Sequence, residues 1–354
     1  MAKVRFGLGF GGSFACMALA VAACSEAPAD VSGSGGTAGS GGQGMAGALA
    51  GSAGQSVVPA GGGGAGGASA QAGASGSQGG APVAGTSSGG GGGGGGAANP
   101  GAKASAGCGK AATQALETFV EAHVTAKGFD RQYFVRLPAG YDPQRPYPTV
   151  VVAAGCGGKG DGGISIQDAS KSDAIVLGLS PSAEVAGRDC FMTESPTSPE
   201  IDFFDAALAA VEAGFCVDQS RIFMEGFSSG SWLTNLIGCA RGDVLRGQGN
   251  ASGGPPPLPD CKGPIATIMV HDMNDDPNKY EGGVQTRNRI RELNGCMDMT
   301  APWDPMFPEC VAYQGCPAAY PLVFCTTTGK GHTENKPFST EGFWKFWSSL
   351  PAKP

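Results

Sequence analysis

Ser228 lies in the five-residue pattern Gly226-Phe227-Ser228-Ser229-Gly230, which has the G-x-S-x-G form of a serine nucleophile held in a tight turn. Such a turn pushes the serine hydroxyl out above a sheet, and the residues two before and two after the serine have to be small. Gly226 and Gly230 meet this requirement around Ser228. A register centred on Ser229 would place Phe227 at a position that must be small, so we reject it.

The segments on either side of the pattern favour a nucleophile over an ordinary loop of glycine and serine. Residues 221–225 contain the apolar run Ile-Phe-Met, which predicts a buried strand. Residues 231–240 carry apolar side chains at helical spacing. A strand, a sharp turn and a helix form the context in which a nucleophilic serine is presented.

A serine hydroxyl is a weak nucleophile and needs a base that is oriented by an acid. His332 follows a predicted strand at 322–325 and lies in a polar loop rather than on an apolar face, which favours a catalytic base over a packed core histidine. His123, in a helix-like segment, and His271, at the end of a strand, are interpreted as structural.

The acid is predicted in the loop that follows another buried strand, at 265–270. Asp272, Asp275 and Asp276 share this loop, and each of them could instead cap it. The loop leaves the same edge of a parallel sheet as the serine turn and the His332 loop, where open α/β sheets build their sites.

Two backbone N–H groups must also face the oxygen that becomes negative during acyl transfer. Ser229, directly after the nucleophile, would supply one. The loop after a predicted strand at 147–154 would supply the other from Cys156 or Gly157, and we take Cys156 as the candidate. A phosphate-binding loop is the alternative for this glycine cluster, but the Lys-Ser/Thr ending that it needs is absent.

These residues need a sheet to bring them together, and strand and helix patterns alternate along the chain. Strands are predicted at 132–137, 147–154, 174–179, 221–225, 265–270 and 322–325, and helices after Ser198 with Pro199 in the first turn, at 231–240, at 284–293 and at 340–350. This order predicts a mostly parallel sheet covered by helices on both faces.

Residues 1–24 have the features of an export signal. A positively charged start and an apolar run precede Val-Ala-Ala-Cys, which resembles the lipobox of bacterial lipoproteins, so we expect lipidation at Cys24. A plain secretory signal or a short membrane helix are the alternatives. Residues 25–106 are mainly Gly, Ala and Ser, and we expect a disordered linker with a reach of roughly 50 Å.

Residues 107–354 are long enough for one α/β domain with a buried core. The formal net charge is −7 without a basic cluster, which argues against nucleic acid as a partner. Ten cysteines remain besides Cys16 and Cys24, and this even number predicts disulfides in an exported chain. Zinc is the poorer interpretation because no C-x-x-C pair occurs, so we expect no metal.

A longer set of motifs resembles a known family. LPAGYDP with PYPTVVVAAGCGG, then CVDQSRIFMEGFSSGSWLTN, then VHDMNDD with NGC, then GCP and FCTTTGKGH resemble the secreted polyhydroxybutyrate depolymerase-like and feruloyl esterase-like members of the α/β-hydrolase superfamily. The resemblance spans about residues 129–347. It implies the α/β-hydrolase fold and hydrolysis of carboxylic esters without a metal or cofactor. The implied substrates are feruloyl or acetyl esters of polysaccharides, or hydroxyalkanoate esters.

The resemblance also assigns individual residues. The family's H-G-x-x-D loop, laid on residues 271–275, makes Asp275 the acid; its glycine is Asp272 here, and the histidine of the family's H-G-C-G-G strand end is Ala154. The resemblance implies a Cys156–Cys190 disulfide that pins the oxyanion loop. We further expect two bonds near His332, Cys310–Cys316 and Cys296–Cys325.

The sequence thus predicts an exported or lipid-anchored serine esterase, a monomer that touches the membrane only through its lipid. Feruloyl or acetyl esters of polysaccharides are favoured over solid polyhydroxybutyrate, because the chain offers no second module for binding a surface. Trp232 and Phe191 are candidate walls for an aromatic acyl group, with core packing as the alternative. The other hypotheses are a polyhydroxybutyrate depolymerase, a peptidase on the same scaffold and a non-catalytic surface-binding lipoprotein.

Overall fold

The computed structural model describes residues 101–255 and 261–353. The predicted signal, the lipidation site at Cys24 and nearly all of the predicted linker lie outside these residues. Within them, no helix is long and apolar enough to cross a membrane.

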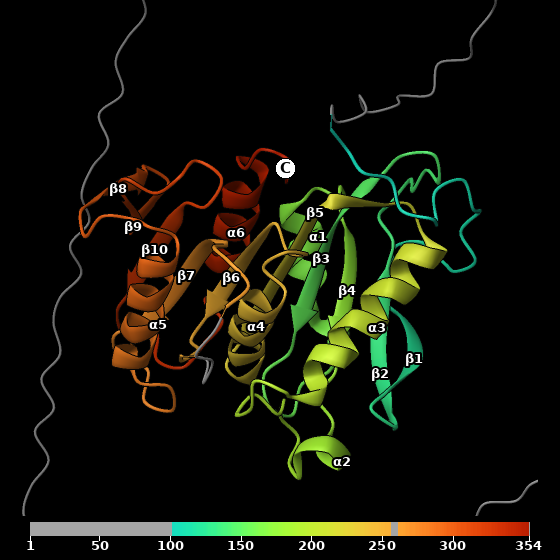
Figure 1. Ribbon diagram of the computed structural model, residues 1–354, viewed down its shortest axis with the longest axis horizontal. Helices are drawn as coiled ribbons and strands as arrows, with labels where there is room; N and C mark the ends of the chain where they lie inside the picture. The colour runs from blue at the N-terminus through green and yellow to red at the C-terminus, as the bar shows by residue number, and fades with distance from the viewer. Residues whose placement is uncertain (1–100, 256–260, 354) are drawn as a thin grey trace, which may run out of the picture. The chain divides into compact units, whose positions relative to one another are not determined.

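A ten-stranded sheet runs through the described residues in the order β1-β2-β4-β3-β5-β6-β7-β10-β9-β8 (Figure 1). The strands are β1 Val120–Ala126, β2 Phe129–Arg136, β3 Tyr147–Ala153, β4 Ile175–Leu179, β5 Val217–Phe227, β6 Gly247–Ala251, β7 Ala266–Asp272, β8 Thr300–Asp304, β9 Phe307–Tyr313 and β10 Leu322–Thr327. Neighbours from β4 through β10 pair in parallel, and the pairings at both edges are antiparallel. The sheet is therefore mostly parallel, as predicted.

Helices cover both faces of the sheet. In Figure 1, α3 (Pro199–Gly214), α4 (Ser229–Ala240) and α5 (Tyr280–Leu293) lie in front, whereas α1 (Ile164–Ala169) and α6 (Phe338–Ser348) lie behind. Short turns of helix, α2 (Ala183–Ala186) and η1 (Gly160–Gly162), lie in the connecting loops. The helix α3 begins as predicted, with the Ser198 hydroxyl accepting a hydrogen bond from the N–H of Glu200.

Three apolar clusters follow from this arrangement, and the two largest lie on opposite faces of the sheet. The front core packs α3 and α4 against the sheet, with Phe203, Phe204 and Leu233 fully buried. The rear core holds α6 against the sheet, where the ring of Trp347 stacks on Phe223 at 5.1 Å. Because the sheet is buried on both faces, the sequences of its central strands are nearly unbroken runs of apolar residues.

His123 lies in a strand and not in the helix-like segment that the sequence predicted. Its segment, VEAHVTA in β1, alternates between more and less exposed positions at the edge of the sheet. The ring nitrogens of His123 contact Asp130 at 2.8 Å and Glu121 at 3.0 Å on the surface. The alternation of exposure at every second residue, rather than a helical period, is what indicates a strand here.

Five disulfides join the ten cysteines of the domain: Cys108–Cys216, Cys156–Cys190, Cys239–Cys261, Cys296–Cys316 and Cys310–Cys325. The predicted Cys156–Cys190 bond is confirmed. The predicted pairs Cys310–Cys316 and Cys296–Cys325 are wrong, because Cys310 and Cys325 face each other directly across antiparallel strands β9 and β10. Disulfides at this density are typical of exported proteins.

The folded domain begins before residue 107, the predicted end of the linker. The N–H of Lys103 donates to the Asp218 carboxylate at 3.0 Å, and the buried hydroxyl of Ser105 donates to the carbonyl of Phe215 at 2.8 Å. A composition poor in large apolar residues concealed this segment, which is held mainly by backbone hydrogen bonds.

Candidate active site

The turn between β5 and α4 holds Ser228 in a backbone conformation that non-glycine residues rarely adopt. Its φ and ψ angles are 55° and −119°. A Cβ atom on Gly226 would lie 2.2 Å from the carbonyl oxygen of Gly230, and one on Gly230 would lie 1.9 Å from that of Ala153. The small residues that the pattern requires on both sides of Ser228 are therefore demanded by close backbone contacts.

A chain of hydrogen bonds connects Ser228 to two other side chains. The Oγ atom of Ser228 lies 3.0 Å from Nε2 of His332, and Nδ1 of His332 lies 2.9 Å from both carboxylate oxygens of Asp275. With its proton on Nδ1, the imidazole donates to Asp275 and leaves Nε2 free to accept the hydroxyl proton. The His332 ring also packs on Phe227 at a centroid distance of 4.8 Å.

Asp275 is the aspartate of its loop that contacts His332. Its side chain is fully buried beneath the imidazole. The N–H of Asn278 donates to Oδ1 of Asp275 at 3.0 Å, and Nε2 of His271 lies 3.4 Å from Oδ2. These groups fix the direction of the carboxylate, since both of its oxygens have partners.

Asp272 performs a different task from Asp275. Its buried carboxylate accepts four hydrogen bonds, from the N–H groups of Asn274, Lys330 and Gly331 and from the hydroxyl of Thr327. Burial alone would raise the pKa of Asp272, but the hydrogen bonds outweigh it and hold the pKa below its ordinary value. Asp272 thereby anchors the loop that carries His332, whereas Asp276 is exposed and pairs with Lys279.

Asn278 is a site residue that the sequence analysis missed. Its amide donates to the carbonyl of Ser252 at 2.7 Å, its side-chain oxygen lies 3.4 Å from the indole nitrogen of Trp232, and its own carbonyl accepts from His271 at 2.7 Å. It therefore ties the Asp275 loop to the wall of the adjoining cavity. Its position three residues after Asp275 was the signal that could have pointed to it.

The N–H groups predicted for an oxyanion hole lie at the mouth of a cavity. Ser229 is the first residue of α4, where the N–H has no acceptor within the helix and the helix dipole favours negative charge. Cys156 follows β3 and is tied to Cys190 by a disulfide. The N–H of Gly157, the alternative donor, already donates to the carbonyl of Asp189 at 2.7 Å, which favours Cys156.

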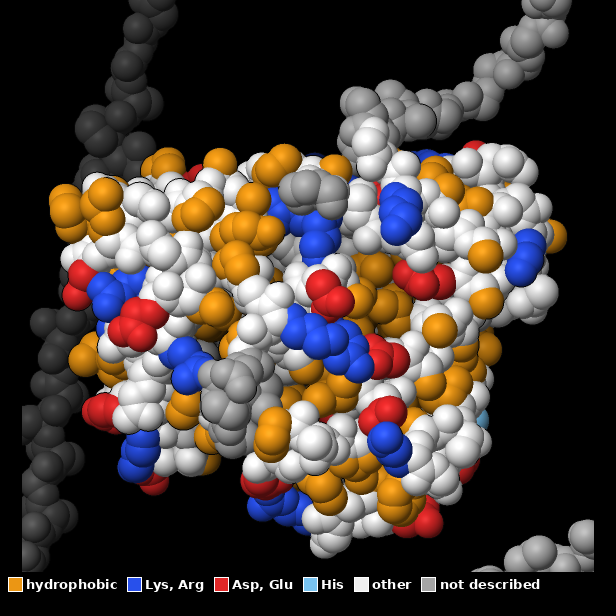
Figure 2. Space-filling model, viewed as in Figure 1, with side chains coloured by type: hydrophobic (Ala, Val, Ile, Leu, Met, Phe, Trp, Pro, Cys, Tyr) orange, Lys and Arg blue, Asp and Glu red, His pale blue; other side chains and the backbone are white. Residues whose placement is uncertain are grey.

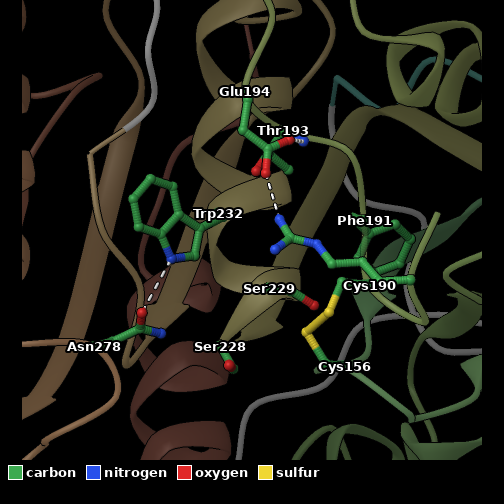
Figure 3. A pocket seen from close by; sticks show the side chains of 10 residues that line it. Cys156, Cys190, Phe191, Thr193, Glu194, Ser228, Ser229, Trp232 and Asn278 are labelled. Carbon is green, nitrogen blue, oxygen red and sulfur yellow. Dashed lines mark hydrogen bonds and ion pairs between the residues drawn. A yellow bond between two sulfur atoms is a disulfide. The ribbon is translucent and has the colours of Figure 1, made fainter. Parts of the chain in front are cut away.

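A cavity of about 360 Å³ opens beside Ser228. Figure 3 shows Trp232 on one side of it, with Phe191 and the Cys156–Cys190 disulfide on the other. Both predicted wall residues thus line the cavity, although Phe191 is only 1% exposed and forms part of its packed base. An ion pair of two exposed side chains, Arg188 and Glu194, completes the lining.

On the face shown in Figure 2, Lys and Arg side chains are interspersed with Asp and Glu side chains. Among residues 101–255 and 261–353, no group of three or more His, Cys, Asp or Glu side chains is placed to hold a metal ion.

Several known proteins with a similar sequence or fold are named as esterases. Feruloyl esterase D of Neurospora crassa is 26% identical over 264 residues, which cover 69% of this chain and 90% of that protein. A probable feruloyl esterase C of Aspergillus terreus is 28% identical over 263 residues, or 69% of this chain and 91% of that protein. An acetyl xylan esterase from Aspergillus awamori shares the fold with a TM-score of 0.54 at 13% identity, covering 66% of this chain and all of that one. No family model matches the chain.

The described residues have the α/β-hydrolase fold, and the chain resembles feruloyl esterases in sequence. Two departures from the family's motifs can now be located in this α/β-hydrolase. Asp272, which replaces the glycine of the H-G-x-x-D loop, supplies the anchor for the His332 loop. Ala154, which replaces the histidine at the end of β3, lines a second cavity together with Phe227, the residue before Ser228.

The α/β-hydrolase core also contains a carboxyl group that the sequence analysis did not single out. Glu225 lies in β5, three residues before Ser228, and is 4% exposed. Burial raises the pKa of Glu225 to about 8, although the charge of Lys336 acts in the opposite direction. Glu225 is therefore largely protonated at neutral pH.

Proposed function

We propose that this protein is an exported serine esterase that hydrolyses carboxylic esters with Ser228, His332 and Asp275. The observation that supports this most strongly is the continuous chain of hydrogen bonds from Oγ of Ser228 through His332 to the buried Asp275. It lies at the mouth of a cavity large enough for an acyl group. A strained serine conformation is the expected setting for a nucleophile.

The geometry supports acyl transfer in two steps. Oγ of Ser228 attacks the ester carbonyl carbon while Nε2 of His332 takes the hydroxyl proton, and Asp275 stabilises the resulting imidazolium. The N–H groups of Ser229 and Cys156 bind the negative oxygen of the tetrahedral intermediate. His332 then gives its proton to the alcohol oxygen as the C–O bond breaks. Water, activated by the same imidazole, releases the acid from Ser228.

Feruloyl or acetyl esters of polysaccharides are the proposed substrates. The names of the relatives, feruloyl esterase and acetyl xylan esterase, support this class. The cavity volume of about 360 Å³ exceeds what an acetyl group needs, and Trp232 offers an aromatic wall at its side. Among these esters, the aromatic acyl group therefore fills the cavity better.

The proposed setting is the outside of the cell. The five disulfides and the exported character that they imply support it. We propose that a lipid on Cys24 anchors the protein to the membrane and that the domain acts as a monomer on soluble or wall-linked esters, without nucleic acid or a cofactor. Substitution Cys24→Ser should release the protein from the membrane fraction into the medium, whereas retention there would contradict lipidation.

Activity can be tested with a fluorophosphonate probe and a panel of esters. The full-length protein should be labelled, and it should hydrolyse methyl ferulate or acetylated xylan faster than hydroxybutyrate oligomers. Ser228→Ala and His332→Ala should each reduce kcat by about 10⁴-fold or more, since these residues act as a unit. Labelling that persists in Ser228→Ala would show that Ser228 is not the nucleophile. Absence of any ester hydrolysis by the folded protein would contradict the proposed function.

A further inference from the structure

The indole of Trp232 connects the cavity beside Ser228 to the loop that carries the acid. Trp232 and Ser228 line the same cavity, and Asn278 lines it beside them (Figure 3). The indole N–H points to the side-chain oxygen of Asn278, at 3.4 Å. The ring also packs closely on the backbone of Gly254, where a Cβ atom would lie 2.3 Å from it. A group that enters the cavity therefore meets an aromatic wall whose polar edge contacts Asn278.

The position of Asn278 determines the position of the Asp275 carboxylate. The main-chain N–H of Asn278 donates to Oδ1 of Asp275 at 3.0 Å. Its carbonyl accepts from the buried imidazole of His271 at 2.7 Å, and the same nitrogen of His271 lies 3.4 Å from Oδ2 of Asp275. Asn278 thus acts on one oxygen directly and on the other through His271. Both oxygens contact His332, so a shift of Asn278 changes how the acid meets the base.

The bond between Trp232 and Asn278 is the long one among the hydrogen bonds of Asn278. The side-chain amide donates to the carbonyl of Ser252 at 2.7 Å, and the two main-chain bonds measure 2.7 and 3.0 Å. At 3.4 Å, the bond to the indole exceeds the usual range for N–H···O bonds. Hydrogen bonds around a catalytic site often reach full strength only when substrate is bound. This bond has room to shorten when an acyl group packs on the indole.

We propose that Asn278 is a positioning residue that couples the acyl group to the catalytic acid. An aromatic acyl group packed on Trp232 shortens the bond from the indole to Asn278, and Asn278 then holds Asp275 firmly against His332. The inference rests on the proposed function, since it assigns the acyl group to the cavity beside Ser228. Contacts far from the reacting carbonyl are in this way used for alignment. An acetyl group is too small to act on the indole, so the preference for aromatic acyl groups lies in kcat.

The kinetic test compares methyl ferulate with methyl acetate, which share the alcohol and differ in the acyl group. Trp232→Phe keeps an aromatic wall but has no N–H for Asn278. The ratio of kcat for the ferulate to kcat for the acetate should therefore fall by about 5-fold or more, as for one lost hydrogen bond, while KM for the ferulate changes by less than about 2-fold. Asn278→Ala should lower the same kcat ratio by a similar factor.

The double variant Trp232→Phe, Asn278→Ala shows whether the two side chains act together. If they act through one bond, its kcat ratio should be no lower than that of the worse single variant, since no coupling is left to remove. Multiplied losses in the double variant would overturn the proposal. So would an unchanged ratio in the single variants, because equal losses on both esters indicate a merely structural role. Asn288→Ala is the matched control: its amide contacts Arg287 on α5, and the ratio should stay the same.

A measurement without catalysis separates this inference from the proposed function. The chain contains four tryptophans, and the indole N–H signal of Trp232 is the NMR signal that is missing in Trp232→Phe. In the Ser228→Ala protein, ferulate should move this signal downfield as the bond shortens. With Asn278→Ala added, the move should be smaller, because the ring current of ferulate remains but the acceptor is gone.

The two failures have different signatures. Absence of ester hydrolysis by the wild-type protein would remove the proposed function. An indole signal that ferulate leaves unmoved, or moves equally with and without the Asn278 amide, would remove the coupling even if ester hydrolysis were intact.

Discussion

The two loops that flank Ser228 are held in place by different kinds of bond. The oxyanion-side loop, after β3, is tied by the Cys156–Cys190 disulfide to the loop after β4. The base-side loop, after β10, carries His332 and contains no cysteine. It is held by the carboxylate of Asp272, which accepts the N–H groups of Lys330 and Gly331 at 3.0 and 3.1 Å.

Because the two bonds differ in chemistry, the two loops are sensitive to different conditions. A disulfide is insensitive to moderate changes of pH but is lost on reduction. The Asp272 anchor is insensitive to reduction but depends on ionisation. The low pKa of Asp272 keeps the anchor charged over the ordinary pH range, and its stabilisation is lost only as the pH falls through that lowered value. The two sides of one site can therefore be perturbed independently.

The largest effect on the base side is expected from Asp275→Asn. The amide cannot stabilise the imidazolium and favours the wrong tautomer of His332, so kcat should fall by about 10³-fold or more with little change in thermal stability. Asp276→Asn is the matched control, because Asp276 is exposed and pairs only with Lys279 among the described contacts. Steady-state kinetics on one ester would check both. A greater loss in Asp276→Asn would show that the acid is assigned wrongly.

Asp272→Asn should give a smaller loss, on the order of 10- to 100-fold in kcat. The side-chain NH2 group of the asparagine would face two of the four groups that donate hydrogen bonds to Asp272. Losing these hydrogen bonds loosens the His332 loop and costs about 2 kcal/mol of stability. Denaturant unfolding at pH 7 would measure the second effect. Unlike Asp275→Asn, this variant should lose both stability and activity. An unchanged midpoint of unfolding would contradict the anchoring role.

On the oxyanion side, replacing both Cys156 and Cys190 by serine should lower kcat/KM by roughly 10-fold, since one of two donors loses its fixed position. The double replacement of Cys239 and Cys261 is the control. It should destabilise the protein by a similar amount, about 3 kcal/mol for a loop of this order, yet leave kcat/KM nearly unchanged. Equal activity losses in both pairs would show that the first disulfide acts through stability alone.

Glu225→Gln should have the smallest effect on activity. It tests instead how the stability of the protein depends on pH. The raised pKa of Glu225 means that its stabilising effect is complete below its ordinary value of 4.5 and is lost as the pH rises towards about 8. Wild-type stability relative to the variant should therefore decrease over this interval, by about 4 kcal/mol at most. Unfolding curves at pH 5 and pH 8 would show it. A constant difference between the two proteins would mean that Glu225 is ionised throughout.

The elements around Ser228 could be predicted because their signals are local. Gly226 and Gly230 are required by contacts within a few residues, and the flanking strand and helix have clear apolar periods. The choice of Asp275 from the residues alone was open, since it depends on which of three neighbouring carboxylates the loop turns towards His332. The resemblance to the family supplied that choice.

Other parts could not be predicted because they depend on distant partners. Strand β6, with the sequence GQGNA, has no apolar pattern, yet Gly249 is needed there because a Cβ would lie 2.6 Å from the ring of Phe343. The pairing of Cys310 with Cys325 is set by the register of β9 on β10. The same dependence on tertiary structure concealed Asn278 and the second cavity.

Both ends of the described domain meet at Ser220, near the start of β5. Its hydroxyl lies 3.5 Å from the carbonyl of Gly101, and its carbonyl accepts the N–H of Lys353 at 3.2 Å. Ser228 lies eight residues further along the chain, just beyond the carboxyl end of β5 and about 25 Å away. A circular permutant that joins these ends by a short linker, or a bead that holds the domain by either end, would therefore leave the substrate entrance facing the solution.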